Sequence, residues 1–478
     1  MSKDRRNILI LFVIGLIFAR NDFWNYGDIG MAFLLNDMML LKAKDAGISF
    51  VTLINDMPAG YCATLYQHTY NYSLSVFLVH LLTKIFGFSP YNIAYLAIIT
   101  YFTTIAAAYY LGSILVDRRF GFVFGLLFAV DVYFNVNVRT GSGIFFLTPL
   151  LLISCVSFFL MGHRSSYNER KRLLFLIVSA FLLSLCFFHG YGLTFISLPI
   201  LVIFALLLSL KNHLRLNIKK TDAGYDEFES PRPYVYALFL VQGGLFYLLV
   251  SLSWDLYTGA ELYTTINRTL GGSFARQASP FVPLDEYYLR VCLVFYDLFV
   301  DMDKNGIFAL GGIHSDTSCP GEPFIPYLLS PFFIFGFYSS LKERALTGWL
   351  FVILFLSFCY VLVMHFQPYA PRVWVPITLF VLLIVTKGCL DAYKALEGSS
   401  YGNYLYPIVG LFLVLILFVS YNKVSFFTHE RGGNKIWQNG QPGIVKLLAD
   451  NSLGKNNALI IMGDKPSYGW LQYIYVNK

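Results

Sequence analysis

The feature that most constrains this chain is a repeated pattern of long apolar runs separated by short, often basic loops. A run of about 20 apolar residues is the length that a helix needs to cross the hydrocarbon core of a bilayer. Hydrophobic residues make up 57% of the chain and charged residues 13%, whereas soluble domains are about half apolar and a quarter charged. The sequence therefore predicts an all-α polytopic membrane protein.

Eleven runs are predicted to span the membrane. They are residues 8–19, 91–116, 120–136, 143–161, 173–188, 193–210, 234–254, 325–341, 349–366, 373–388 and 405–421. Three basic residues precede the first run, and Arg20 follows it where a signal peptide would have a cleavage site of small residues. We therefore predict an uncleaved first span with the N-terminus in the cytoplasm.

Two further apolar segments are predicted not to span. Residues 73–87 are apolar over only about 14 residues, a length typical of interfacial segments. With this segment lying flat, about half of the 35 lysines and arginines fall in cytoplasmic loops, as the positive-inside rule requires. If it spanned, every later loop would invert. Residues 287–302 are excluded because Arg290, Asp297 and Asp301 interrupt them.

This topology predicts a transmembrane domain at residues 1–421, with outer loops at 20–90 and 255–324, and a small extracytoplasmic α/β region at 422–478. The inner loops are mostly short and basic, so we expect the protein to work at the outer face of a bacterial inner membrane. The sequence has no P-loop or GxGxxG, which argues against an ATP-driven pump and against nucleotide-sugar chemistry. Its seven cysteines form no CxxC motif.

One acidic residue early in the first outer loop is a candidate general base. Asp28 is flanked by aromatic residues and glycines, and a carboxylate there can take a proton from an acceptor hydroxyl or amine. The alternative is a solvated aspartate, or an N-cap for a helix over 31–41. Asp56 precedes a Met-Pro pair and fits turn chemistry, and His68 is a further candidate contact in this loop.

Isolated charges in otherwise uncharged outer turns predict an anion site. Arg139 and Arg372 both break the outward depletion of positive charge, and a guanidinium pairs with phosphate in a bidentate fork. Snorkelling to lipid headgroups is the alternative. Tyr369 shares the turn of Arg372. Asp131 lies inside a predicted span, and His189 lies in a Gly-flanked turn, so both are possible substrate contacts or helix-stabilising groups.

Several of these motifs together resemble the GT-C glycosyltransferases, in particular the protein O-mannosyltransferase and lipid A aminoarabinose transferase branch. They are Gly27-Asp28, Tyr66-Gln67-His68, Lys84-Ile85-Phe86-Gly87, Asp117-Arg118-Arg119-Phe120-Gly121, Val138-Arg139 and Pro371-Arg372-Val373-Trp374-Val375-Pro376. The resemblance covers roughly residues 5–210 and, more loosely, 325–390. It implies a bundle of about eleven helices with interfacial helices in the outer loops.

The resemblance also implies an inverting transfer of a sugar from a polyprenyl-phosphate donor to a lipid, glycan or protein acceptor. Asp28 would be the base, and Arg139 and Arg372 would contact the donor phosphate. The sequence departs from the family pattern where Thr69-Tyr70 replace prolines, where Gly143 and Ile144 replace a carboxylate, and where no second acid follows Asp28. No two histidines share metal-ligand spacing. We therefore predict metal-independent chemistry, with no cofactor and no nucleic-acid partner.

Two other functions stay open. An O-antigen-type glycan polymerase or ligase would rely on arginines of the 255–324 loop, such as Arg268, Arg276 or Arg290, in place of Asp28. A lipid or glycan transporter, which is not an enzyme, would be expected to show internal repeats or broken helices in corresponding halves, and the sequence shows neither.

Overall fold

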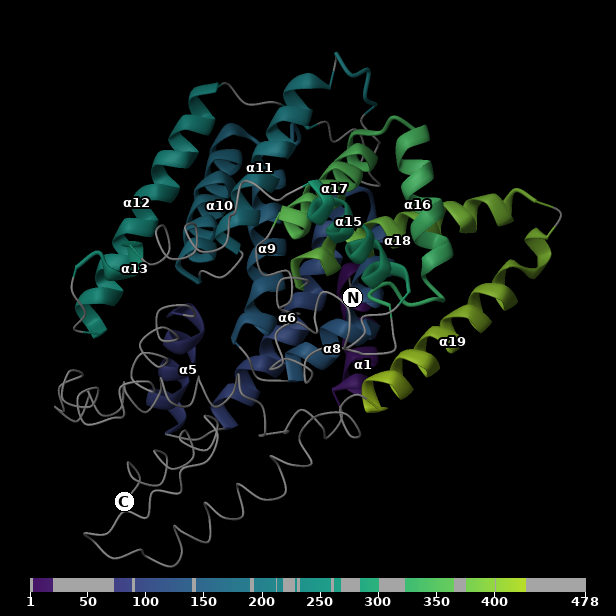
Figure 1. Cartoon of the computed structure of the whole chain (residues 1–478), viewed down its shortest axis with the longest axis horizontal. Helices are drawn as coiled ribbons and strands as arrows, with labels where there is room; N and C mark the ends of the chain where they lie inside the picture. Colours follow the sequence, from purple (N-terminus) through teal and green to yellow (C-terminus); the bar gives the residue numbers. More distant parts are fainter. Residues whose placement is uncertain are drawn as a thin grey trace, which may run out of the picture.

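The computed structural model describes residues 3–19, 73–87, 91–139, 143–189, 193–211, 213–217, 228–229, 233–258, 262–267, 284–300, 323–364, 375–399 and 401–426. Within these ranges the regular elements are helices (Figure 1). They are α1 Lys3–Phe18, α5 Ser73–Phe86, α6 Tyr91–Leu115, α7 Arg118–Val130, α8 Val132–Arg139, α9 Gly143–Gly162, α10 Glu169–His189, α11 Leu193–Leu210, α12 Pro233–Thr258, α13 Thr264–Asn267, α15 Leu284–Phe299, α16 Ser330–Lys342, α17 Leu346–Met364, α18 Val375–Glu397, the short 3-10 helix η5 Gly402–Tyr404 and α19 Leu405–Phe426.

The predicted all-α membrane architecture is confirmed, because every predicted span contains a helix. Four helical stretches are long and apolar enough to cross a bilayer: Tyr95–Leu115, Glu169–His189, Tyr234–Tyr257 and Gly402–Ser425. Shorter apolar helical stretches lie at Leu74–Phe86, Leu147–Gly162, Ser197–Leu210 and Leu346–Ser357 among the described residues, and the number of eleven spans stays a prediction. The segment 73–87 is helical, as α5.

The predicted span over 120–136 is not a single helix. The chain breaks at Asp131, whose φ of −61° and ψ of 124° are extended, so that α7 ends at Val130 and α8 begins at Val132. The Asp131 carboxylate accepts the backbone N–H of Phe134 at 2.7 Å. The amide of Asn135 donates to the carbonyls of Ala129 and Asp131 at 3.0 and 2.8 Å. These bonds satisfy backbone groups that a break would otherwise leave unpaired in apolar surroundings.

Glycines allow the closest helix contacts in the bundle. Gly336 of α16 and Gly388 of α18 lie so close that a Cβ on either residue would collide with backbone atoms of the other helix. Small residues at helix contacts let backbones approach, which strengthens packing where lipid gives no hydrophobic driving force. α6 and α7 meet in the same way at Gly112 and Gly121.

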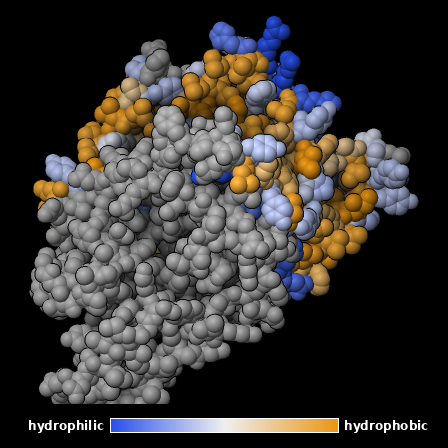
Figure 2. All heavy atoms as spheres, in the orientation of Figure 1, coloured by the Kyte–Doolittle hydropathy of each residue, from blue (hydrophilic) through white to orange (hydrophobic). Residues whose placement is uncertain are grey.

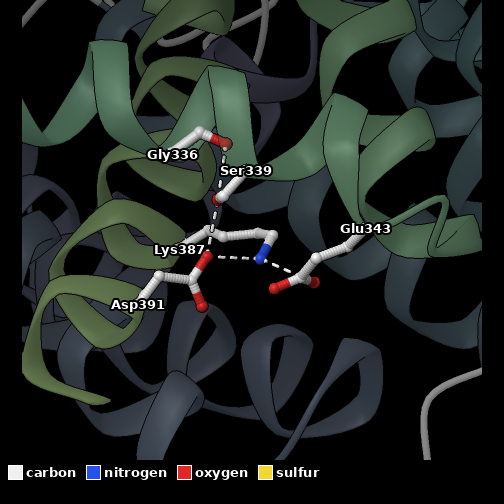
Figure 3. Close-up of polar contacts among 5 residues, drawn as sticks. All are labelled: Gly336, Ser339, Glu343, Lys387 and Asp391. Carbon is white, nitrogen blue, oxygen red and sulfur yellow. Dashed lines mark hydrogen bonds and ion pairs between the residues drawn. The ribbon is translucent and has the colours of Figure 1, made fainter. Parts of the chain in front are cut away.

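An ion-pair cluster around a buried lysine joins α16 to α18 beside this contact (Figure 3). Lys387 Nζ donates to Glu343 Oε2 at 3.0 Å and also to the Asp391 carboxylate one turn further along α18. The Ser339 hydroxyl donates to the same Asp391 carboxylate at 2.6 Å. Lys387 is only 5% exposed, so its charge depends on these two carboxylates for compensation.

The loops that were predicted to face the cytoplasm meet at one end of the bundle. Arg118 pairs with Asp4 at 3.0 Å, and Arg172 pairs with Glu229 at 2.9 Å. Arg164 donates to the carbonyl of Ile114 at 2.7 Å, and it also forms a β-bridge with Phe228. The predicted cytoplasmic loops therefore share one end; that this end faces the cytoplasm stays a prediction.

The apolar surface of the molecule fits a bilayer environment. Figure 2 shows a broad hydrophobic zone with hydrophilic residues gathered along its upper edge. In Figure 1, α12 and α13 lie at one edge of the bundle and α19 at the other. Both α12 and α19 expose many leucines and aromatic residues. Because a soluble protein does not leave such surfaces to water, the chain is an integral membrane protein.

Candidate active site

The end of the bundle opposite the joined loops collects polar side chains on α5, α8, α10, α12 and α15. α7 and α10 both begin beside the ion pairs at the first end and run away from it, so Asp131 and His189 both lie at the second end. Of the eight predicted site residues, these are the two whose side chains the structure describes. Asp131 is 7% exposed and His189 is fully buried.

The remaining predicted site residues cannot be placed in the same way. Arg139 is the last residue of α8, at the same end as Asp131, and its side chain lies outside the description. The other five, Asp28, Asp56, His68, Tyr369 and Arg372, lie outside the described residues. The C-terminal region 422–478 is described only to Phe426, where α19 ends.

The structure shows a cluster of hydrogen-bonded side chains on α5 and α12 that the sequence did not predict. His80 Nε2 and the Tyr257 hydroxyl lie 2.6 Å apart, and Lys84 Nζ donates to the same hydroxyl at 3.3 Å. The Lys84 ammonium also lies 5.6 Å from the centre of the Tyr257 ring, a cation–π arrangement. His80 is buried and Lys84 is exposed, so the cluster presents a positive charge next to a phenol at the end of a short apolar helix.

Aromatic packing ties this cluster to the end of α10. The Trp254 ring makes edge-to-face contacts with Phe77 of α5 and with Phe188 of α10, at centroid distances of 6.2 and 6.0 Å. Phe188 precedes His189 directly. The next residue of α12, Asp255, is fully buried and accepts both the hydroxyl and the backbone N–H of Thr265, which fixes α13 against α12.

Two charged side chains of α15 point inward. Arg290 is 6% exposed and Asp297 is fully buried, whereas Tyr288, Phe295 and Tyr296 on the opposite face are exposed. A surface helix in water has the opposite arrangement, with its charges outward and its apolar face inward. Inward charges and an outward apolar face fit a helix beside lipid, because the apolar face then meets hydrocarbon. Arg290 and Asp297, two of the charges that excluded this segment from the predicted spans, therefore point into the protein, and buried ionisable groups of this kind are candidates for a functional site.

Phe324 connects α15 to the broken helix. Its backbone N–H donates to the carbonyl of Asp297 at 2.9 Å, and its ring packs edge-on against Tyr133 of α8 at 5.0 Å. The helix break at Asp131 and the inward face of α15 are thus parts of the same end of the bundle. In the part of the chain that the structure describes, no group of three or more His, Cys, Asp or Glu side chains lies close enough to hold a metal.

Comparisons with known proteins identify the fold. No protein-family model and no curated protein matches the sequence. Among solved structures, ArnT from Cupriavidus metallidurans bound to undecaprenyl phosphate aligns over 98% of this chain and 84% of its own, with a TM-score of 0.58 and 11% sequence identity. The chain has the GT-C fold.

A second GT-C glycosyltransferase, the archaeal oligosaccharyltransferase AglB from Archaeoglobus fulgidus, is similar in the same way. Its structure with a tethered acceptor peptide has a TM-score of 0.52 and 13% identity. Its complex with an inhibitory peptide and a dolichol-phosphate has a TM-score of 0.51 and 14% identity. The chain spans 58% and 59% of these two structures, while they cover 94% and 95% of this chain. The resemblance seen in the sequence motifs is therefore confirmed for the fold.

Proposed function

We propose that this protein is a membrane glycosyltransferase that moves a sugar from a polyprenyl-phosphate donor to a lipid, glycan or protein acceptor at the outer face of the membrane. The observation that carries the proposal is the GT-C fold over nearly the whole chain, since the similar structures hold undecaprenyl phosphate or a dolichol-phosphate. The polar groups collected at one end of the apolar bundle support it, because a lipid-linked donor brings its charged part to the membrane surface.

Lys84 is the described residue best suited to meet the phosphate of such a donor. It lies in the last turn of α5, a helix of 14 residues whose length fits the membrane interface. The Tyr257 hydroxyl beside it adds a neutral hydrogen-bond donor, and His80 holds that hydroxyl from the buried side. An ammonium and a hydroxyl together can bind phosphate oxygens while the polyprenyl chain stays in the hydrocarbon.

In the proposed reaction, Asp28 accepts the proton of the acceptor hydroxyl or amine. The acceptor atom then forms a bond to the anomeric carbon of the sugar, and the bond from that carbon to the phosphate oxygen breaks. The polyprenyl phosphate leaves with the electron pair, and its negative charge is neutralised by Arg139 and Arg372. Cationic stabilisation of this leaving group is the reason to expect metal-independent transfer.

Phosphate binding by Lys84 is tested with two lysine variants of the protein in lipid nanodiscs. Lys84→Met is expected to weaken binding of undecaprenyl phosphate about tenfold, the loss of one charge-assisted contact. The control is Lys423→Met, which removes the same charge from the last turn of α19. Equal affinities of the two variants for undecaprenyl phosphate would show that Lys84 does not bind the donor phosphate. A wild-type protein that does not bind the lipid at all would contradict the proposed function.

A second candidate, the O-antigen-type polymerase or ligase, is favoured by one observation. Arg290 is buried on the inward face of α15. In that case Arg290→Gln would abolish glycan transfer while Asp28→Asn would leave it intact. The glycosyltransferase proposed here requires Asp28 in every turnover.

A further inference from the structure

Hydroxyl groups in the membrane helices of this protein usually bond to their own helix. Thr100, Thr104, Ser157 and Thr386 each donate to the carbonyl four residues earlier, at 2.6 to 2.7 Å. Such back-bonding satisfies a hydroxyl in surroundings that contain no water. A buried hydroxyl that lacks such a bond is therefore an exception among these helices.

Thr148 and Thr378 depart from this pattern. Thr148 of α9 is 1% exposed and Thr378 of α18 is 3% exposed, yet neither hydroxyl has a hydrogen-bond partner. A hydroxyl buried without a partner loses its hydration and gains nothing in return. Both residues lie close to the first turn of their helices, at the end of the bundle that carries the candidate active site.

Asn135 contributes a third unpaired group. Both bonds of its amide nitrogen go to carbonyl oxygens, those of Ala129 and Asp131, so the nitrogen must be the atom on that side. The side-chain oxygen Oδ1 therefore faces the other way, where it is fully buried and has no partner. It is a hydrogen-bond acceptor held in a fixed orientation by the helix break at Asp131.

These three groups come from helices that pack on one another. α8 contacts α9, and α9 contacts α18. One of the groups accepts hydrogen bonds only, and each threonine hydroxyl can both accept and donate. None is charged, which suits neutral hydroxyl groups better than a phosphate.

We propose that Asn135, Thr148 and Thr378 form a hydrogen-bonding wall for the sugar hydroxyls of the lipid-linked donor. This inference rests on the proposed function and adds the residues that recognise the sugar. A sugar hydroxyl donates to Asn135 Oδ1, and others exchange hydrogen bonds with the two threonines. The unpaired state of these groups in the ligand-free protein is then the preorganisation that makes binding selective for a glycosylated lipid.

The test compares lipid phosphate with and without a sugar. Thr148→Val and Thr378→Val keep the side-chain shape and remove only the hydroxyl. Each is expected to weaken binding of the preferred member of a panel of undecaprenyl-phosphate monosaccharides about 3- to 10-fold, with binding of plain undecaprenyl phosphate unchanged. Both variants should unfold at or above the wild-type temperature, because they remove a hydroxyl that has no partner.

Two controls separate the wall from general effects of a lost hydroxyl. Thr386→Val removes a back-bonded hydroxyl from the same helix as Thr378, and Ser340→Ala removes an unpaired buried hydroxyl from the other end of the bundle. Neither is expected to change the preference for the glycosylated lipid. The proposed wall would be overturned if the wild type and both threonine variants preferred the glycosylated lipid over plain undecaprenyl phosphate to the same extent. It would also be overturned if the wild type bound every glycosylated lipid no better than plain undecaprenyl phosphate. In both cases lipid-phosphate binding, and with it the proposed function, would stand. No binding of either lipid would overturn both.

Discussion

Replacing Lys387 by methionine is expected to destabilise the contact between α16 and α18 strongly. The substitution keeps the apolar stem and removes the charge that lies 3.0 Å from Glu343 and against Asp391. Two unit charges at that separation interact by about 5.5 kcal/mol at an effective dielectric constant of about 20. Removing one partner of a buried pair costs about 3–5 kcal/mol, because the remaining charge stays buried.

The exposure of each carboxylate decides how this cost is divided. Glu343 is 36% exposed and is therefore screened by solvent, whereas Asp391 is 13% exposed. We assign most of the expected loss, about 3 kcal/mol or more, to the uncompensated Asp391 carboxylate. Adding Asp391→Asn to Lys387→Met should therefore recover most of the stability.

Unfolding by SDS titration in mixed micelles measures this loss. Lys394→Met is the matched control, since it removes an exposed lysine from the same helix. If Lys387→Met and Lys394→Met unfolded at the same SDS fraction, the ion-pair cluster would not hold these helices together, and the reasoning from burial and charge would be wrong.

Three further outcomes are expected. Burial lowers the pKa of His163 to about 4, from an ordinary value of 6.5. The stability that the neutral imidazole contributes is therefore fully present above pH 6.5 and is lost as pH falls through about 4. His163→Phe should flatten this part of the profile of stability against pH, measured by thermal unfolding. Gly388→Ala should cost at least about 2 kcal/mol in SDS unfolding because its Cβ would overlap the Phe332 carbonyl, while Gly410→Ala, with no neighbour within 4 Å, should be neutral. In a variant whose sole cysteine is Cys292, on the exposed face of α15, a membrane-impermeant maleimide should react slowly in the bilayer and rapidly after unfolding in SDS, because the attacking thiolate forms in water and not in hydrocarbon; rapid reaction in the bilayer would place this face in water.

The sequence was sufficient to predict the helices but not where they break. α11 begins and ends at the predicted residues, because an uninterrupted apolar run leaves no other way to satisfy its backbone in lipid. The break at Asp131 was missed because one charged residue hardly changes the average hydropathy of a span. The N-cap rule applied to Asp131 and Phe134 is the signal that could have revealed it.

The candidate site was predictable only in part, for a different reason. Asp131 and His189 stand out in sequence because ionisable groups are rare in apolar segments. The cluster of His80, Lys84 and Tyr257 joins residues more than 170 positions apart, and no local sequence pattern predicts that contact. Arg290 and Asp297 of α15 follow a helical period that was visible in the sequence, but which face of the helix lies inward became clear only from the packing.

The most direct test of the proposed function is the release of undecaprenyl phosphate from lipid-linked sugars by the reconstituted protein and its Asp28→Asn variant. Wild-type protein should release the lipid phosphate in the presence of acceptor, and the variant should bind the donor with unchanged affinity yet turn over at least about 100-fold more slowly, as expected for loss of a general base. A folded variant with full activity would contradict the role of Asp28. A wild type that transfers no sugar from any donor, with lipid, glycan and peptide acceptors all supplied, would contradict the proposed glycosyltransferase itself.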